Sequence, residues 1–285
     1  MRFLITGANG QLAREFIRIL NKEDIITLTK EELDISDLNA VEKCVGSLNP
    51  DVILNCAAYN LVDKSEDDIE TAIRVNAHGV KNLAAASKRF NAFFVHYSTD
   101  YVFDGKKEDF YTEDDEPIPI NNYGKSKLSG ERYLQDETDN FLLFRVSWVF
   151  GKGRQNFLCK LLDLADKNKV IRIVSDQISV PTYVNDIAKT TLSALGKGLK
   201  GIYHLTNSGY ASRYEVARYF LEKLGKKNLI LPVRSDYFPC SAKRPYFSAM
   251  SNNKISKAVD AAIPDWEDGI DRYVEDYTKH GERVF

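Results

Sequence analysis

Short apolar runs alternate with amphipathic stretches over the first 150 residues. The runs lie at 3–6, 25–29, 52–56, 93–98 and 141–146, and helix-period patterns fill 11–20, 36–48, 66–90 and 123–137. Apolar runs of four to six residues separated by helices predict βαβ units and a parallel sheet. Because such crossovers are right-handed, helices should cover both faces of that sheet. The pattern therefore predicts an α/β fold with a doubly wound parallel sheet over residues 1–150.

The rhythm loosens after residue 150. Helix patterns near 154–167, 184–196, 212–225 and 265–279 mix with apolar runs at 170–174, 202–206 and 229–233. Prolines at 181, 232, 239 and 245 are among those that interrupt this half. We expect residues 151–285 to form mainly a smaller α/β substrate lobe. Since no linker separates the halves, part of 183–206 is expected to return to the first domain.

Charge and composition exclude several classes of partner. The 285 residues carry a net charge of -2 and are 44% hydrophobic, so neither nucleic acid nor an anionic membrane is an expected partner. No apolar run approaches the roughly 20 residues of a membrane span, and the N-terminus lacks the layout of a signal peptide. We expect a cytoplasmic protein with no membrane partner.

Cysteine and histidine spacings predict no metal centre. Four cysteines lie far apart without a Cys-x-x-Cys motif, and the four histidines share no ligand spacing. We expect reduced, buried thiols, and the site prediction contains no metal.

A glycine-rich turn follows the first predicted strand and opens the first predicted helix. Gly7 permits a tight turn and Gly10 lets the backbone approach a pyrophosphate, while N–H groups at the helix start hold the phosphates. Ala13 replaces the usual third glycine and is still small enough for close packing. The turn predicts a Rossmann-type NAD(P)-binding domain, with cofactor contacts from Gly7, Asn9, Gly10, Gln11 and Leu12.

The end of the second predicted strand leaves NADH and NADPH both open. NAD binders usually carry an acid there, which bonds the ribose 2′-hydroxyl. Here Leu28-Thr29-Lys30 offers none, and Lys30 either faces a 2′-phosphate or is an ordinary surface lysine. Asp34 and Ile35 follow closely and are expected to border the adenine.

Tyr123 and Lys127 are a candidate proton donor and its cationic partner. Their spacing of four residues puts both side chains on one face of a helix. A free tyrosine has a pKa of about 10, which a nearby ammonium lowers by stabilising the phenolate. The tyrosine can then protonate the oxygen that forms as a carbonyl accepts hydride.

Placement distinguishes this pair from a second one. Tyr219 and Lys223 have the same spacing in a helix without other chemical features, and are expected to be ordinary surface and core. Thr99, by contrast, ends the fourth predicted strand shortly before Tyr123. Ligands bind beyond the carboxyl ends of parallel strands. Thr99 can therefore hold a substrate carbonyl beside Tyr123, although a turn cap is its alternative role.

Motifs that carry a family resemblance run through most of the chain in order. They are the turn at 7–13, Asn55-Cys56-Ala57-Ala58-Tyr59 with Val62-Asp63-Lys64, Val75-Asn76, Ser98-Thr99-Asp100-Tyr101-Val102-Phe103, Tyr123-Gly124-Lys125-Ser126-Lys127-Leu128, Arg145-Val146-Ser147-Trp148-Val149-Phe150, Asn156-Phe157, Asp176-Gln177 and Arg244-Pro245. With them the sequence resembles the extended short-chain dehydrogenase/reductase family, and most of all its dTDP-4-dehydrorhamnose reductase branch.

The resemblance implies NAD(P)H-dependent reduction of dTDP-4-dehydro-L-rhamnose to dTDP-L-rhamnose. It implies that Tyr123 is the proton donor, Lys127 its partner and Thr99 the carbonyl-holding hydroxyl. Further implied contacts are Ala57, Ala58 and Tyr59 with the cofactor, and Asp100, Trp148, Asn156 and Arg244 with the substrate. Residue chemistry supports two of these. An aromatic face such as that of Trp148 suits a sugar ring, and the fork of Arg244 suits a diphosphate. A core tryptophan and a surface ion pair are the alternatives.

Two departures from the branch concern a metal and a dimer. Some members bind magnesium at a dimer contact through glutamates. Glu15 stands at one matching position, but Asn185 occupies another that should be acidic, and Tyr183 is unusual nearby. The sequence thus argues against magnesium and leaves monomer and homodimer open.

Three rival functions use related sequences. A nucleotide-sugar dehydratase needs Asp-Glu after the strand-end threonine, whereas Tyr101 follows Asp100 here. A sugar epimerase uses the same Tyr-Lys pair. A non-catalytic subunit, like the regulatory subunit of methionine adenosyltransferase, also resembles this branch, but Thr99, Tyr123 and Lys127 favour an enzyme.

Overall fold

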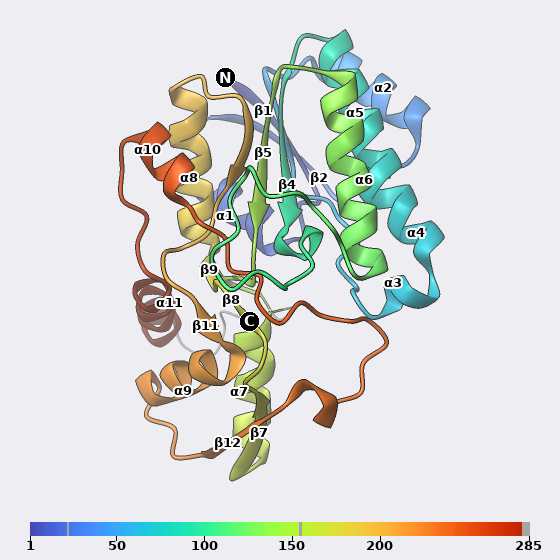
Figure 1. Cartoon of the computed structure of the whole chain (residues 1–285). Helices are drawn as coiled ribbons and strands as arrows, with labels where there is room; N and C mark the ends of the chain where they lie inside the picture. The colour runs from blue at the N-terminus through green and yellow to red at the C-terminus, as the bar shows by residue number, and fades with distance from the viewer. Residues whose placement is uncertain (22, 154–155, 281–285) are drawn as a thin grey trace.

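A six-stranded parallel sheet forms the centre of the molecule (Figure 1). The computed structural model describes residues 1–21, 23–153 and 156–280. In spatial order the strands are β2 (Asp24–Leu28), β1 (Arg2–Thr6), β3 (Val52–Asn55), β4 (Phe93–Thr99), β5 (Phe141–Val146) and β10 (Gly201–His204). Every neighbouring pair is parallel. The predicted doubly wound Rossmann-type sheet is confirmed.

Helices cover both faces of the sheet (Figure 1). One layer contains α2 (Leu38–Leu48), α5 (Gly79–Arg89) and α6 (Asn122–Glu137); the other contains α1 (Gln11–Ile19), α8 (Val184–Gly196) and α10 (Asn253–Val259). The second layer draws on the later half of the chain, since α8 packs against α1 and β10 pairs with β5. The sequence patterns gave no sign of α10.

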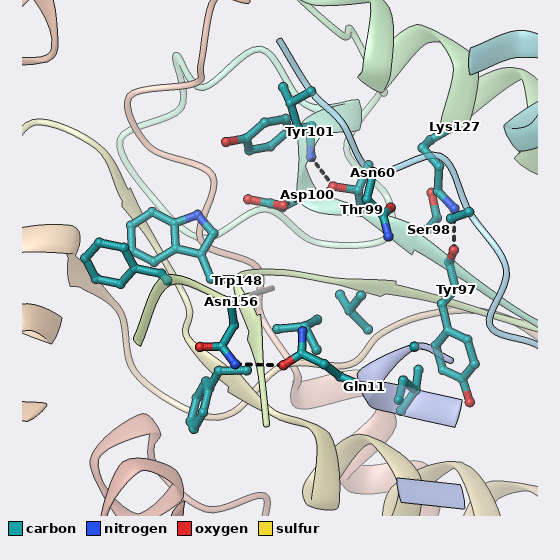
Figure 2. Close-up of a pocket in the computed structure, with 18 of the residues that line it drawn as sticks. Gln11, Asn60, Tyr97, Ser98, Thr99, Asp100, Tyr101, Lys127, Trp148 and Asn156 are labelled. Carbon is teal, nitrogen blue, oxygen red and sulfur yellow. Dashed lines mark hydrogen bonds between the residues drawn. The ribbon is translucent and has the colours of Figure 1, made fainter. Parts of the chain in front are cut away.

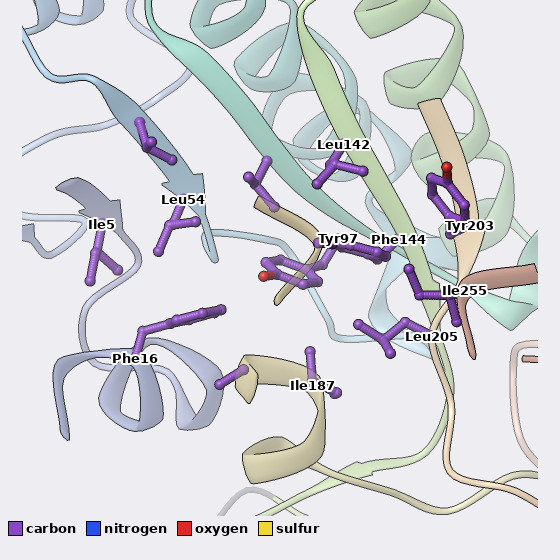
Figure 3. Packing of buried hydrophobic residues seen from close by; sticks show 14 of the residues in the cluster. Ile5, Phe16, Leu54, Tyr97, Leu142, Phe144, Ile187, Tyr203, Leu205 and Ile255 are labelled. Atoms are coloured by element: carbon purple, nitrogen blue, oxygen red, sulfur yellow. The ribbon is translucent and has the colours of Figure 1, made fainter. Parts of the chain in front are cut away.

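Side chains along β4 alternate between the two faces of the sheet. Tyr97 packs with Phe16, Phe144 and Ile187 in the cluster between the sheet and α1 and α8 (Figure 3). Its hydroxyl lies 3.0 Å from that of Thr191. Because successive strand residues point to opposite faces, the neighbours of Tyr97 are turned toward α6.

The helix expected over 66–90 is wrong as a single element. The stretch comprises α3 (Lys64–Asp67), α4 (Ile69–Ile73), a π-helical turn (Arg74–His78) and α5. Asp68 separates α3 from α4 because its backbone leaves helical geometry. Its carboxylate then caps α4 by accepting from the Thr71 N–H at 3.0 Å. In the π turn, Asn76 bonds both the N–H and the carbonyl of Tyr59, at 2.8 and 3.0 Å.

The remaining elements form a smaller lobe below the sheet in Figure 1. Its elements are β6 (Val149–Phe150), α7 (Phe157–Lys167), β7 (Val170–Val174), β8 (Ile178–Ser179), β9 (Thr182–Tyr183), β11 (Ala211–Ser212), α9 (Arg213–Lys223), β12 (Leu229–Val233) and α11 (Trp266–His280). They enclose their own apolar cluster. The predicted helix start at 154–155, and the last residues of the predicted lobe, 281–285, lie outside the described residues.

Within residues 1–21, 23–153 and 156–280 no helix is long and apolar enough to cross a membrane. The four cysteines are free thiols, but the expectation of burial is wrong for Cys240, which is exposed.

Candidate active site

A pocket of about 400 Å³ opens at the carboxyl ends of the central strands (Figure 2). It lies where the sheet domain meets the smaller lobe. The predicted site residues that line it are Gly10, Gln11, Leu12, Ala57, Ala58, Thr99, Asp100, Tyr123, Lys127, Trp148 and Asn156. Segments far apart in sequence therefore converge on one cavity.

The start of α1 fits a dinucleotide phosphate. Gly7 has a φ of 66°, and a Cβ there would come within 2.7 Å of the Ala57 nitrogen, so only glycine lets the two loops meet. Gly10 precedes the helix without any side-chain cap. The first-turn N–H groups, which have no partner within a helix, thus face the pocket beside Gln11 and Leu12.

The other predicted cofactor residues lie outside the pocket lining. Asn9 is exposed and Ile35 is buried in the core behind the sheet. Hydrogen bonds from Ser36 lower the pKa of Asp34, with help from Arg74. The backbone N–H of Tyr59 donates to the side-chain oxygen of Asn76.

Tyr123 sits in the first turn of α6. Asn121 caps this helix by accepting from the Gly124 N–H at 2.7 Å. A Cβ on Gly124 would collide with the Tyr101 carbonyl, so glycine brings the helix against the end of β4. The Tyr123 hydroxyl donates to Asn60 at 3.3 Å. The predicted lowering of the Tyr123 pKa by Lys127 is wrong for this structure, because burial raises that pKa and only a hydrogen bond with Thr99 opposes the rise.

Lys127 lies one turn further along α6 and is 2% exposed. Its ammonium donates to the Tyr97 carbonyl at 2.6 Å (Figure 2). The same nitrogen lies 3.5 Å from His96 Nε2. Burial lowers the pKa of Lys127 to about 8, while the charge of Glu131 raises it. Burial and the Lys127 charge hold the pKa of His96 well below its usual range.

Thr99 and Asp100 form a buried network after β4. The Thr99 hydroxyl accepts from the Tyr101 N–H at 3.1 Å and donates to Asp100 at 3.2 Å. Asp100 also accepts from Ser179 at 2.9 Å and Ser248 at 2.6 Å. Burial raises the pKa of Asp100 to about 6 against these hydrogen bonds. The network ties the carboxyl end of β4 to Ser179 of β8 and to the segment around Ser248.

Trp148 forms the far wall of the pocket with an unusual backbone. Its φ of 40° lies in the left-handed region, which a bulky residue seldom adopts. The guanidinium of Arg213 lies 4.1 Å from its ring centroid, and 5.1 Å from that of Phe157. Arg213 lines the pocket, yet no motif in the sequence pointed to it.

Two predicted substrate residues are already engaged. The Asn156 amide donates to Gln11 Oε1 and to the Gly151 carbonyl, both at 2.8 Å, and its oxygen caps α7. Arg244 lies outside the pocket lining, where it pairs with Asp63 at 2.6 Å. Asn156 therefore joins the phosphate turn to the smaller lobe.

The second Tyr-x-x-x-Lys pair is remote from the pocket. Tyr219 and Lys223 both bond Asp271 on α11, at 3.1 and 2.8 Å. They belong to the smaller lobe, as expected for a pair without chemistry around it.

Glu15 does not fit a magnesium site. Arg18 pairs with its carboxylate at 2.6 Å and Asn185 donates to it at 2.6 Å. In the described part of the chain, no three His, Cys, Asp or Glu residues are grouped to hold a metal. We derive no step through a metal.

The fold and the pocket together define a class of protein. A phosphate-binding turn, Thr99, Tyr123 and Lys127 around one cavity make the chain an NAD(P)-dependent oxidoreductase of the short-chain dehydrogenase/reductase type. Residues 1–279 match the model of the RmlD substrate binding domain, and the chain belongs to that family.

Individual relatives are similar over nearly their whole length. The spore coat polysaccharide biosynthesis protein SpsK of Bacillus subtilis is 37% identical over 96% of this chain and 97% of its own. A dTDP-4-dehydrorhamnose reductase of Burkholderia thailandensis is 36% identical over 97% and 99%. The solved structure of the Bacillus anthracis dTDP-4-dehydrorhamnose reductase in complex with NADP has a TM-score of 0.94, at 36% identity over 97% of this chain and 99% of that one.

Proposed function

We propose that this protein reduces the 4-keto group of a dTDP-linked 4-keto-6-deoxy sugar with NADH or NADPH, and specifically converts dTDP-4-dehydro-L-rhamnose to dTDP-L-rhamnose. The observation that carries the proposal is the meeting of Thr99, Tyr123 and Lys127 in the pocket that also contains the phosphate turn. Similarity to dTDP-4-dehydrorhamnose reductases supports the choice of substrate.

The chain offers one continuous surface for the cofactor. Gly7, Gly10 and the first turn of α1 would hold the pyrophosphate, with Asn9, Gln11 and Leu12 beside it. Ala57, Ala58 and the loop to Tyr59 would border the nicotinamide half, and Asp34 and Ile35 the adenine. When bound, the cofactor supplies the hydride that reduces the ketone carbon.

Three side chains would act on the ketone oxygen. Tyr123 donates its phenolic proton to that oxygen, and the Lys127 ammonium stabilises the phenolate left behind. The Thr99 hydroxyl holds the same oxygen when its proton turns from Asp100 toward the substrate. Because burial raises the pKa of Tyr123, the phenol keeps its proton until the substrate oxygen takes it.

Other residues would place the sugar and the diphosphate. Asp100 and Trp148 border the space in front of Thr99 and would contact the sugar. Arg244 would bind a phosphate after giving up part of its pairing with Asp63. Asn156 acts through Gln11, since its own amide is already bonded.

A spectrophotometric assay with product analysis tests the proposal. Purified protein is mixed with dTDP-4-dehydro-L-rhamnose and either NADH or NADPH, and the reduced cofactor is followed by absorbance. Cofactor loss matched by dTDP-L-rhamnose supports the proposal. An altered sugar without net cofactor loss indicates an epimerase. Cofactor binding without turnover of any 4-keto-6-deoxy sugar favours a binding subunit, and either result contradicts the proposal.

A further inference from the structure

Arg213 brings a cation from the smaller lobe to the pocket. It is the first residue of α9, follows the Ser212 cap and is only partly exposed. Its guanidinium lies over the Trp148 ring and near the Phe157 ring, at 4.1 and 5.1 Å. Stacking on the two rings and a hydrogen bond with Tyr101 fix the orientation of the planar group. A guanidinium has five N–H donors, so it can still bond an anion in the pocket.

Among the described residues no carboxylate forms an ion pair with this guanidinium, and Asp100 acts on it only through its charge. Two other arginines have an acid: the buried Arg145 pairs with Glu131 at 2.7 Å, and the partly buried Arg272 pairs with Asp186 at 2.8 Å. For Arg213, no Asp or Glu oxygen of the described residues lies within 4.0 Å. An unpaired buried cation is costly, and an anion bound in the pocket would offset that cost.

A second arginine, Arg244, also acts on Tyr101 through its charge. Burial raises the pKa of Tyr101, and the charges of Arg213 and Arg244 both lower it. The two guanidinium groups also repel, since the charge of Arg244 helps to lower the pKa of Arg213. An anion with two charged groups could contact both arginines and remove this repulsion.

We infer that Arg213 binds one phosphate of the substrate's diphosphate, and that it shares the diphosphate with Arg244. The inference rests on the proposed function for the presence of a nucleotide diphosphate. The guanidinium edge of Arg213 can form two parallel hydrogen bonds with phosphate oxygens. Its planar face meanwhile stays stacked on the Trp148 ring. Arg213 thus couples diphosphate binding to the shape of the sugar pocket.

Binding of dTDP and of thymidine tests the inference without turnover. Both are titrated calorimetrically into wild type, Arg213→Gln and Arg218→Gln, all as the full chain. Arg218 is exposed on the same helix and does not line the pocket, so its variant is the matched control. We expect Arg213→Gln to weaken dTDP binding by about 10- to 100-fold, the usual effect of losing charged hydrogen bonds, and to leave thymidine binding unchanged. The control should bind both as wild type does.

Steady-state kinetics give a second readout. The diphosphate does not react, so Arg213→Gln should raise KM for the nucleotide sugar far more than it lowers kcat. NADPH affinity should stay at the wild-type value, because a loss there would assign Arg213 to the cofactor phosphates and overturn the inference.

Several outcomes would overturn the inference. One is an unchanged dTDP affinity in Arg213→Gln. Another is an equal loss of dTDP and thymidine binding, because that result indicates general damage to the pocket. If Arg213→Gln fails to fold, Arg213→Lys carries the test; it keeps the charge but loses the fork, and should bind dTDP about 3- to 10-fold more weakly. Wild-type affinity in that variant would then overturn the inference. Failure of the proposed function is distinct, since wild type itself would neither bind dTDP nor turn over.

Discussion

The Lys127 ammonium lies 2.6 Å from the carbonyl oxygen of Tyr97, at the end of the strand that carries Thr99. This bond holds a buried cation against β4, in the lining of the pocket. Among the charged groups packed around it, Glu131 raises the pKa of Lys127, whereas burial lowers that pKa to about 8. His96, on the neighbouring strand position, stays neutral.

The first prediction is a fall in activity above pH 8. Lys127 carries its charge below its pKa of about 8 and loses it above, whereas a free lysine would keep it to about 10.4. Because the ammonium stabilises the Tyr123 phenolate, kcat/KM should fall about tenfold per pH unit above 8. A pH–rate profile of the free enzyme measures this. Lys127→Met should be slow at every pH. A wild-type plateau that extends to pH 10 would contradict the prediction.

The second prediction concerns stability and Asp100. Its pKa in the folded protein, about 6, lies above the ordinary value of 3.8. Between these values the folded state binds more protons than the unfolded state, so this group makes stability fall as pH rises through that window. Asp100→Asn can keep the Ser179 and Ser248 bonds without the charge. It should raise the free energy of unfolding at pH 7.5, by up to about 3 kcal/mol, and little at pH 4.

Denaturant unfolding at the two pH values checks this, with Asp104→Asn as the opposite case. Hydrogen bonds and Lys106 hold the pKa of Asp104 below its usual range despite partial burial. That variant should therefore lose stability at pH 7.5. A destabilised Asp100→Asn at pH 7.5 would show that the charge itself holds the network together.

The third prediction is that Gly7→Ala strongly weakens cofactor binding. A Cβ at a φ of 66° and 2.7 Å from the Ala57 nitrogen would separate the phosphate turn from the β3 loop. We expect the dissociation constant for NADPH, measured by fluorescence titration, to rise at least 100-fold. This corresponds to a loss of about 3 kcal/mol of binding free energy. Gly196→Ala, with nothing within 4 Å of the added methyl, should bind normally. Normal binding by Gly7→Ala would mean that the turn does not hold the phosphates.

The fourth prediction concerns the joint between the lobes. Asn156→Ala removes the cap of α7 and the bond to Gln11, so the free energy of unfolding should fall by about 1–3 kcal/mol. The cofactor KM should rise as well, because Gln11 lines the phosphate turn. Thermal unfolding and kinetics measure both. Asn168→Ala, at the exposed other end of α7, is the control; equal effects in both variants would reject a specific role for Asn156.

Local patterns predicted the sheet well, and long-range packing explains what they missed. Apolar runs marked the strands because a parallel sheet is buried on both faces. The break at Asp68 depended on a cap, and α10 is too short for a clear period. Arg213 could not be foreseen, since its meeting with Trp148 joins segments that only the folded smaller lobe brings together. Likewise, the local sequence gave no sign that the Asn156 amide forms hydrogen bonds with Gln11 and Gly151.

The most direct test of the account compares Tyr123→Phe with Tyr219→Phe. Both variants remove one hydroxyl from a Tyr-x-x-x-Lys pair, but only Tyr123 lines the pocket. With dTDP-4-dehydro-L-rhamnose and NADPH, Tyr123→Phe should lose about 10²- to 10⁴-fold in kcat while binding NADPH normally, and Tyr219→Phe should keep its kcat. Near-normal kcat in Tyr123→Phe would contradict the assignment of Tyr123 as the proton donor.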